Sequence, residues 1–410
     1  MSFLLRIVIA IFILFIVEFV FVKKLKNAAK QMWGDRLSTL HKWLPGIYLV
    51  FINIFPVLLI IYWAYSYIFT GTERIYIDNV WWDYLVVYPF WVLSLITVQC
   101  FVLFLLLDII KLALRFLIKS KREEVKSVIL KTNWVLVIFF LIYVPLRVIY
   151  DYNFVSVRVT EVVNSNLPKE LDGFRIALIA DVQADKYTDG NRLNNYLNKV
   201  NEAKPDLILI AGDLITSTPD FISTSAEHLS QLNAPYGVYS CIGDHDNWAY
   251  RGDVARSRKE LASALDSVSI PLVHNKNIIF NVDSAQIVVT FVTNTYSEQI
   301  TDSTLDSLST ECPDCDFKIF LTHQPRIHLM EKADLEGYDL YLAGHTHGGQ
   351  LTLLFPFINL SPTLIETKYV KGDFYLNNLM VVVNRGLGMS IAPVRYNSSP
   401  EITIINLSKL

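Results

Sequence analysis

Residues 340–350 read LYLAGHTHGGQ, a short apolar run that ends in two histidines set among glycines. An unbroken apolar run of this length is typical of a buried β-strand. In an α/β sheet the functional site lies at the carboxyl ends of the strands, which is where His345 and His347 would be placed. One such pair says little alone, but the same arrangement recurs along the chain.

Four other apolar runs, also predicted to be buried strands, are followed by carboxylate, imidazole or amide side chains. The runs are residues 175–180, 207–211, 237–242 and 318–322. The side chains that follow them are, in the same order, Asp181 with Gln183, then Asp213, then Asp244, His245 and Asp246, and finally His323. Carboxylates and imidazoles are ligands of divalent metals. We therefore predict that five turns of an α/β domain meet at a metal site.

This set of motifs resembles the calcineurin-like metallophosphoesterases, whose pattern is Asp-x-His, Gly-Asp, Gly-Asn-His-Asp/Glu, a single His and Gly-His-x-His. The similarity covers about residues 155–407, and the sequence GHTHGGQ is similar to the membrane-anchored branch of the family. The resemblance implies that residues 151–410 form a four-layer α/β/β/α sandwich. It also implies a hydrolase that acts on phosphoric ester or phosphoanhydride bonds.

The resemblance further implies a site with two divalent cations. The ligands of the first ion would be Asp181, Gln183, Asp213 and His347, and those of the second Asp213 as a bridge, Asp244, His323 and His345. His245 would act as general acid or as a donor to the phosphoryl oxygens, oriented by Asp246. Two cations about 3.5–4 Å apart clamp phosphoryl oxygens and lower the pKa of a bridging water.

Two positions depart from the family pattern. Gln183 stands where histidine is usual, and Asp244 where asparagine is usual. Both changes move the site toward oxygen ligands, which favours Mn²⁺, with Mg²⁺, Fe and Zn²⁺ as the other possible ions.

The first 150 residues contain most of the apolar excess of a chain that is 52% hydrophobic and only 18% charged. Four apolar runs lie there, at residues 3–22, 44–69, 81–107 and 134–150. A membrane-spanning helix needs about 20 apolar residues, within a range of roughly 17–25. We therefore predict that residues 1–150 form a transmembrane region of four helices.

Lysine and arginine are concentrated in two of the loops between these runs, around residues 23–42 and 111–131. The positive-inside rule places both loops in the cytoplasm. The α/β domain would then lie on the extracytoplasmic side, either periplasmic or at the cell surface. The net charge of −3 gives no support for a nucleic-acid partner, and the sequence leaves the oligomeric state open.

Together these features predict a membrane-anchored metallophosphoesterase whose substrate is a phosphate ester or diphosphate, possibly lipid-linked, at the membrane surface. One alternative is a cytoplasmic-facing pyrophosphohydrolase of a nucleotide-activated lipid of the UDP-diacylglucosamine type. A second alternative is a membrane sensor that binds metal or phosphate without catalysis.

The sequence leaves two local features open, and each has two interpretations. Cys312 and Cys315 form a small disulfide loop or remain free thiols. The apolar segment 351–360, which follows the two histidines, is a buried strand and turn or a lip that touches the bilayer.

Overall fold

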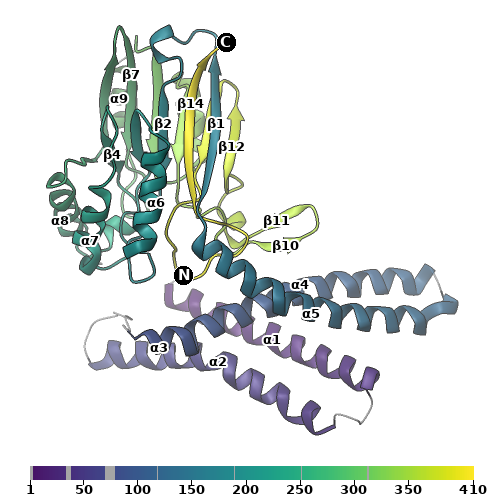
Figure 1. Cartoon of the computed structure of the whole chain (residues 1–410). Coiled ribbons are helices and arrows are strands. Elements are labelled where there is room, and N and C mark those ends of the chain that lie inside the picture. The colour runs from purple at the N-terminus through teal and green to yellow at the C-terminus, as the bar shows by residue number, and fades with distance from the viewer. Residues whose placement is uncertain are drawn as a thin grey trace. The chain divides into compact units, whose positions relative to one another are not determined.

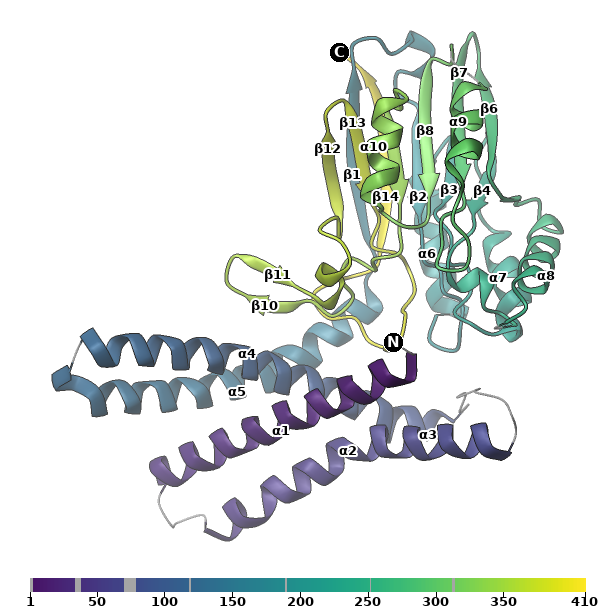
Figure 2. The same cartoon turned by 180° about the vertical axis from the view of Figure 1, so that it is seen from behind.

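The computed structural model describes residues 3–33, 38–69, 79–117, 119–188, 190–250, 252–311 and 314–410. The chain divides into two units. The first comprises Met1–Ile149 with Leu353–Ile358, and the second comprises Tyr150–Thr352 with Asn359–Leu410. Figures 1 and 2 show the elements of both units from opposite sides. Cys312 lies outside the described residues, so its disulfide or thiol state stays a prediction.

The first unit is helical. Its long helices are α1 (Phe3–Trp33), α2 (Ser38–Phe69), α4 (Tyr88–Leu117) and α5 (Arg122–Asn153), and the short α3 (Val80–Trp82) with a π-turn (Asp83–Val87) leads into α4. In the described part of the chain, three stretches are long and apolar enough to cross a membrane: Trp43–Tyr65, Val80–Leu117 and Arg122–Asn153. The predicted first run is helical in α1, and the count of four spans stays a prediction.

A β-hairpin from the C-terminal half of the chain groups partly with these helices. Its strands are β10 (Leu353–Phe355) and β11 (Ile358–Leu360). The side-chain amide of Gln99, a fully buried residue of α4, donates to the Leu354 carbonyl and accepts from the Leu354 N–H, both at 2.7 Å. Phe357 at the turn is fully exposed. The interpretation of residues 351–360 as a buried strand is therefore wrong.

The second unit contains two six-stranded sheets of mixed direction. The strand order of the first is β1 (Ser156–Asn164), β14 (Glu401–Lys409), β2 (Arg175–Ile179), β3 (Leu207–Ile210), β4 (Val238–Cys241), β5 (Leu272–Val273). The order of the second is β12 (Gly372–Leu376), β13 (Leu379–Val383), β9 (Leu340–Ala343), β8 (Phe317–Thr322), β7 (Ala285–Val292), β6 (Lys276–Val282). The predicted α/β class is confirmed.

The central strands of both sheets bury side chains on both faces. One buried cluster joins alternate residues of β2, such as Ile176 and Leu178, to alternate residues of β8, such as Ile319 and Leu321. On its other face the first sheet packs against α6 (Gly190–Glu202), α7 (Ile222–Leu229) and α8 (Val254–Asp266). The second sheet packs on its other face against α10 (Ile327–Leu335), and α9 (Asp302–Thr310) also contributes to that cluster. Figure 1 shows α6 and Figure 2 shows α10 on these faces. Because β2, β3 and β4 are parallel neighbours, and β8 and β9 likewise, their carboxyl ends bring the five predicted turns to one edge.

Candidate metal centre

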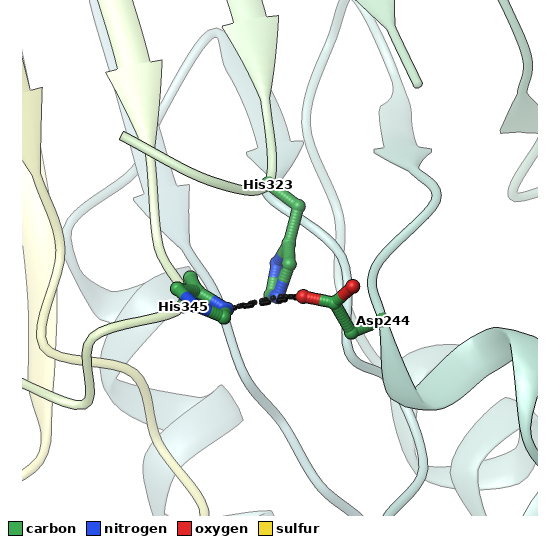
Figure 3. Close-up of side chains that lie close together, drawn as sticks. All are labelled: Asp244, His323 and His345. Atoms are coloured by element: carbon green, nitrogen blue, oxygen red, sulfur yellow. Dashed lines mark hydrogen bonds and ion pairs between the residues drawn. The ribbon is translucent and has the colours of Figure 1, made fainter. Parts of the chain in front are cut away.

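Three predicted ligands meet at the ends of β4, β8 and β9, as Figure 3 shows. The Nδ1 atom of His345 lies 3.1 Å from Oδ2 of Asp244 and 3.2 Å from Nε2 of His323. Nε2 of His323 lies 3.5 Å from the same Asp244 oxygen. Asp244 and His323 are buried, so these atoms face one another away from bulk water.

The other four predicted ligands adjoin this cluster. Oδ2 of Asp213 lies 3.2 Å from Nε2 of His323, which makes Asp213 the neighbour shared by both halves of the site. The Gln183 amide nitrogen donates to that same oxygen at 3.1 Å. His347 Nε2 lies 3.4 Å from Oδ1 of Asp181. The structure therefore brings together all seven residues that the sequence predicts as ligands.

The donor set of this site fits a cation. Nδ1 of His323 faces the Ala211 carbonyl at 2.7 Å, and Nε2 of His345 faces a carboxylate oxygen of Glu366 at 3.2 Å. Because carbonyl and carboxylate oxygens only accept hydrogen bonds, each neutral ring can donate one N–H to that oxygen. The other nitrogen of each ring is then available as a ligand beside the Asp213 and Asp244 carboxylates. Metal-ligating histidines characteristically place their second N–H in this way.

The side-chain oxygen of Gln183 supports the same conclusion. It is buried and has no hydrogen-bond partner. Burying an unpaired amide oxygen costs about 1–3 kcal/mol. A cation held by Asp181, Gln183, Asp213 and His347 would satisfy this oxygen, so the residues on this side also fit a metal.

The site holds its backbone in sparsely populated conformations. Asp181, Gln183, Asp213, His345 and His347 all have positive φ, between 47° and 71°. Non-glycine residues in this region are uncommon and often mark functional turns. Close approach also demands glycine at 243, because a Cβ atom there would lie 2.2 Å from Oδ1 of Asp213.

The acid–base properties of the cluster follow from burial and mutual charge. Burial raises the pKa of Asp181 to about 6. Burial would also raise the pKa of Asp213, but the positive charges of His323 and His245, with the hydrogen bonds from both residues, together lower that pKa. Burial would lower the pKa of His323, whereas the carboxylates of Asp213, Asp181 and Asp244 together raise it well above the ordinary value. Protons thus supply the positive charge that these carboxylates require when no cation is bound.

Asp246, expected to orient His245, makes its hydrogen bonds to the main chain and not to the His245 ring. The Asp246 carboxylate is fully buried and accepts three backbone N–H groups, from Asp213 at 3.0 Å and from Leu214 and Gly243 at 2.8 Å. Asp246 therefore fixes the turn that carries Asp213. The His245 ring instead directs Nδ1 at the main-chain carbonyl of Thr216, and its Nε2 lies 3.3 Å from the Ser390 hydroxyl.

Sequence reasoning missed two residues that support the site. Glu366 bonds His345, and it also accepts from Tyr296 and Arg326, both at 2.7 Å. The bond with His345 lowers the pKa of Glu366 to about 2. Arg395 is fully buried and donates to the carbonyls of Gly388, His347 and Ser398, besides those of Arg385 and Gly386. Neither residue belongs to a sequence motif. For Arg395, the apolar residues around it in the sequence are the one signal that could have indicated a buried arginine.

Comparison with known proteins places these residues in a family. The sequence model of calcineurin-like phosphoesterases matches residues 174–349. The Bacillus subtilis metallophosphoesterase YkuE is 30% identical over 248 residues, 60% of this chain and 82% of the relative. A transmembrane protein with a metallophosphoesterase domain from Danio rerio is 28% identical over 261 residues, 61% of this chain and 56% of the relative. UDP-2,3-diacylglucosamine pyrophosphatase LpxG of Chlamydia trachomatis is 26% identical over 300 residues, 60% of this chain and 88% of the relative. The chain belongs to the calcineurin-like metallophosphoesterase family, a family of hydrolases that use paired divalent metals.

Proposed function

We propose that the protein hydrolyses a phosphate ester or diphosphate on a lipid-linked substrate at the extracytoplasmic membrane surface. In this proposal four helices anchor a four-layer α/β/β/α domain, and Mn²⁺ is the favoured ion. The observation that carries the proposal is the close approach of ring nitrogens and carboxylate oxygens at the site, from His323, His345, Asp213 and Asp244. A relative whose substrate is a lipid-linked diphosphate, LpxG, supports the substrate class.

Two cations, when bound, polarise the phosphoryl oxygens and make a water more acidic. Asp213, between the two halves of the site, is the residue suited to hold both ions. Asp181, Gln183 and His347 would complete the first coordination set, and Asp244, His323 and His345 the second. Asp246 acts as a positioning residue for Asp213 through its three backbone N–H contacts.

His245 is suited to handle the leaving group. Its Nδ1–H is directed at the Thr216 carbonyl, an acceptor only, so the ring keeps that tautomer and presents Nε2 beside Ser390. When the ring is protonated, Nε2 carries the second proton. The geometry therefore allows His245 to pass this proton from Nε2 to the departing oxygen, which is general-acid catalysis.

An assay of the full-length protein in detergent tests this proposal. We expect hydrolysis of p-nitrophenyl phosphate or bis-p-nitrophenyl phosphate with Mn²⁺, and loss of turnover after chelation. In H245N the metal content is expected to stay unchanged while kcat falls by about 10²–10⁴-fold, because a positioned acid contributes about that much. His228→Asn, a change outside the site, is the matched control and should leave kcat unchanged. Absence of hydrolysis of both probes, with two ions bound, would contradict an enzyme and favour the sensor alternative.

Orientation in the membrane separates the proposal from the cytoplasmic pyrophosphohydrolase. A reporter phosphatase fused after Leu410 and expressed in a bacterial cell is expected to be active, because such enzymes work only outside the cytoplasm. A fluorescent protein at the same position, which matures in the cytoplasm, is the complementary control. Fluorescence without phosphatase activity would reverse the orientation and support a nucleotide-activated lipid as substrate.

A further inference from the structure

Two isoleucines of the phosphoesterase unit are almost fully exposed: Ile365 at 93% and Ile391 at 92%. Single exposed apolar residues are common and need no explanation. These two differ because each directly adjoins a residue that contacts a histidine of the site. Ile391 follows Ser390, whose hydroxyl lies 3.3 Å from His245, and Ile365 precedes Glu366, which lies 3.2 Å from His345.

The backbone at Ile391 is strained, and hydrogen bonds hold it in that conformation. The Ala392 N–H bonds the Ser390 carbonyl at 2.6 Å, and Ile391 between them has φ of 64°, so the three residues form a γ-turn. Such turns are rare, and a β-branched residue at positive φ is an outlier. The Gln350 amide fixes both arms, since it accepts from Ser390 N at 2.9 Å and donates to Ala392 O at 2.7 Å. Strain at an exposed isoleucine is typical of a functional position.

The position of Ile365 is also fixed by its neighbours in the chain. It ends a short 3₁₀ turn, Pro362–Ile365, and Glu366 after it is bonded to Tyr296 and Arg326, each at 2.7 Å. Tyr296 is itself 59% exposed, and its ring centroid lies 5.8 Å from that of His345. The positive charge of Arg326 on this side of the site is already paired with Glu366. A ligand that approaches from this side therefore meets mainly apolar surface.

We propose that Ile365, Ile391 and Tyr296, which we term the apolar rim, bind the aliphatic chain of an amphiphilic phosphate ester or diphosphate. The inference rests on the proposed function and names the residues that would bind the hydrocarbon part of its lipid-linked substrate. The membrane-crossing stretches in the same chain would keep the enzyme where such molecules concentrate. When a hydrocarbon chain covers the rim, the exposed apolar surface of these three side chains is removed from water, which favours binding.

The test compares two p-nitrophenyl phosphodiesters, one with a methyl and one with a dodecyl group, on the full-length protein in nanodiscs with Mn²⁺. For I365N/I391N we expect KM for the dodecyl ester to rise about tenfold, with the methyl ester unchanged. Asparagine tolerates positive φ, so the variant should unfold at the same or a higher temperature than the wild type. Leu335→Asn is the control, since Leu335 is 81% exposed at the far end of α10 and should affect neither ester.

The outcomes separate the rim from the proposed function. An equal change for both esters, or no change for the dodecyl ester, overturns the rim; a rim that only inserts into the bilayer gives this result. If the wild type hydrolyses neither of these diesters nor p-nitrophenyl phosphate, the proposed function fails. The rim is then judged by binding of dodecyl phosphate relative to methyl phosphate, which the double substitution must weaken about tenfold for the rim to stand.

Discussion

Replacing Asp213 by asparagine is expected to lower kcat by about a thousandfold or more, equivalent to about 4 kcal/mol. Both oxygens of Asp213 accept hydrogen bonds. Oδ1 accepts from the main-chain N–H of His245 at 2.8 Å, and Oδ2 accepts from the side-chain amide of Gln183 at 3.1 Å. An amide group would turn one of these acceptors into a donor that faces another donor. It would also remove the negative charge that both halves of the site share.

The measurement is p-nitrophenyl ester hydrolysis together with the metal content of the purified protein. We expect D213N to lose at least one of two bound ions along with its turnover. Asp283→Asn makes the same chemical change in the exposed turn between β6 and β7 and should alter neither quantity. Full metal content with more than a tenth of the activity would show that Asp213 is not the bridge.

Replacing Asp246 by alanine is expected to destabilise the phosphoesterase unit by about 3–9 kcal/mol. The substitution leaves three buried N–H groups without an acceptor, and each such loss costs about 1–3 kcal/mol. For a unit of this size we expect Tm to fall by about 10 °C. Because Asp213 lies on the released turn, metal affinity and kcat should fall as well.

Thermal unfolding of the detergent-solubilised protein, followed by tryptophan fluorescence, measures this effect. Asp206→Ala is a matched control, since the Asp206 carboxylate accepts one N–H, from Arg175 at 2.8 Å, at a partly exposed position. It should shift Tm by no more than about a third as much. A fall in kcat of D246A with unchanged Tm and metal content would restore the idea that Asp246 acts through His245.

The strands that carry the site were predictable because they are buried on both faces. Residues 175–180, 207–211 and 340–343 are continuous apolar runs, and each lies within one residue of an observed strand. β1 was not predicted, because charged Arg158 interrupts its apolar pattern. Arg158 bonds Asp373 at 2.6 Å and Glu401 at 3.1 Å, so a tertiary ion pair replaces the usual apolar contact.

The candidate site was predictable as a set of side chains but not as a network of contacts. Strand ends determine where Asp181, Asp213 and His323 lie, and their roles as ligands stay predictions. The partner of His245 could not be predicted, because the Thr216 carbonyl is a main-chain group and every residue has one. The γ-turn at Ile391 leaves no mark either, since no glycine or asparagine signals its positive φ.

The bond between Gln99 and Leu354 has a consequence for how this protein can change during evolution. Gln99 recognises only the N–H and C=O of Leu354, which every residue except proline provides. Mutations can therefore alter the side chains of the hairpin while the attachment to α4 persists. Selection for this attachment would therefore act on Gln99, whereas the side chains of the hairpin could change without breaking it.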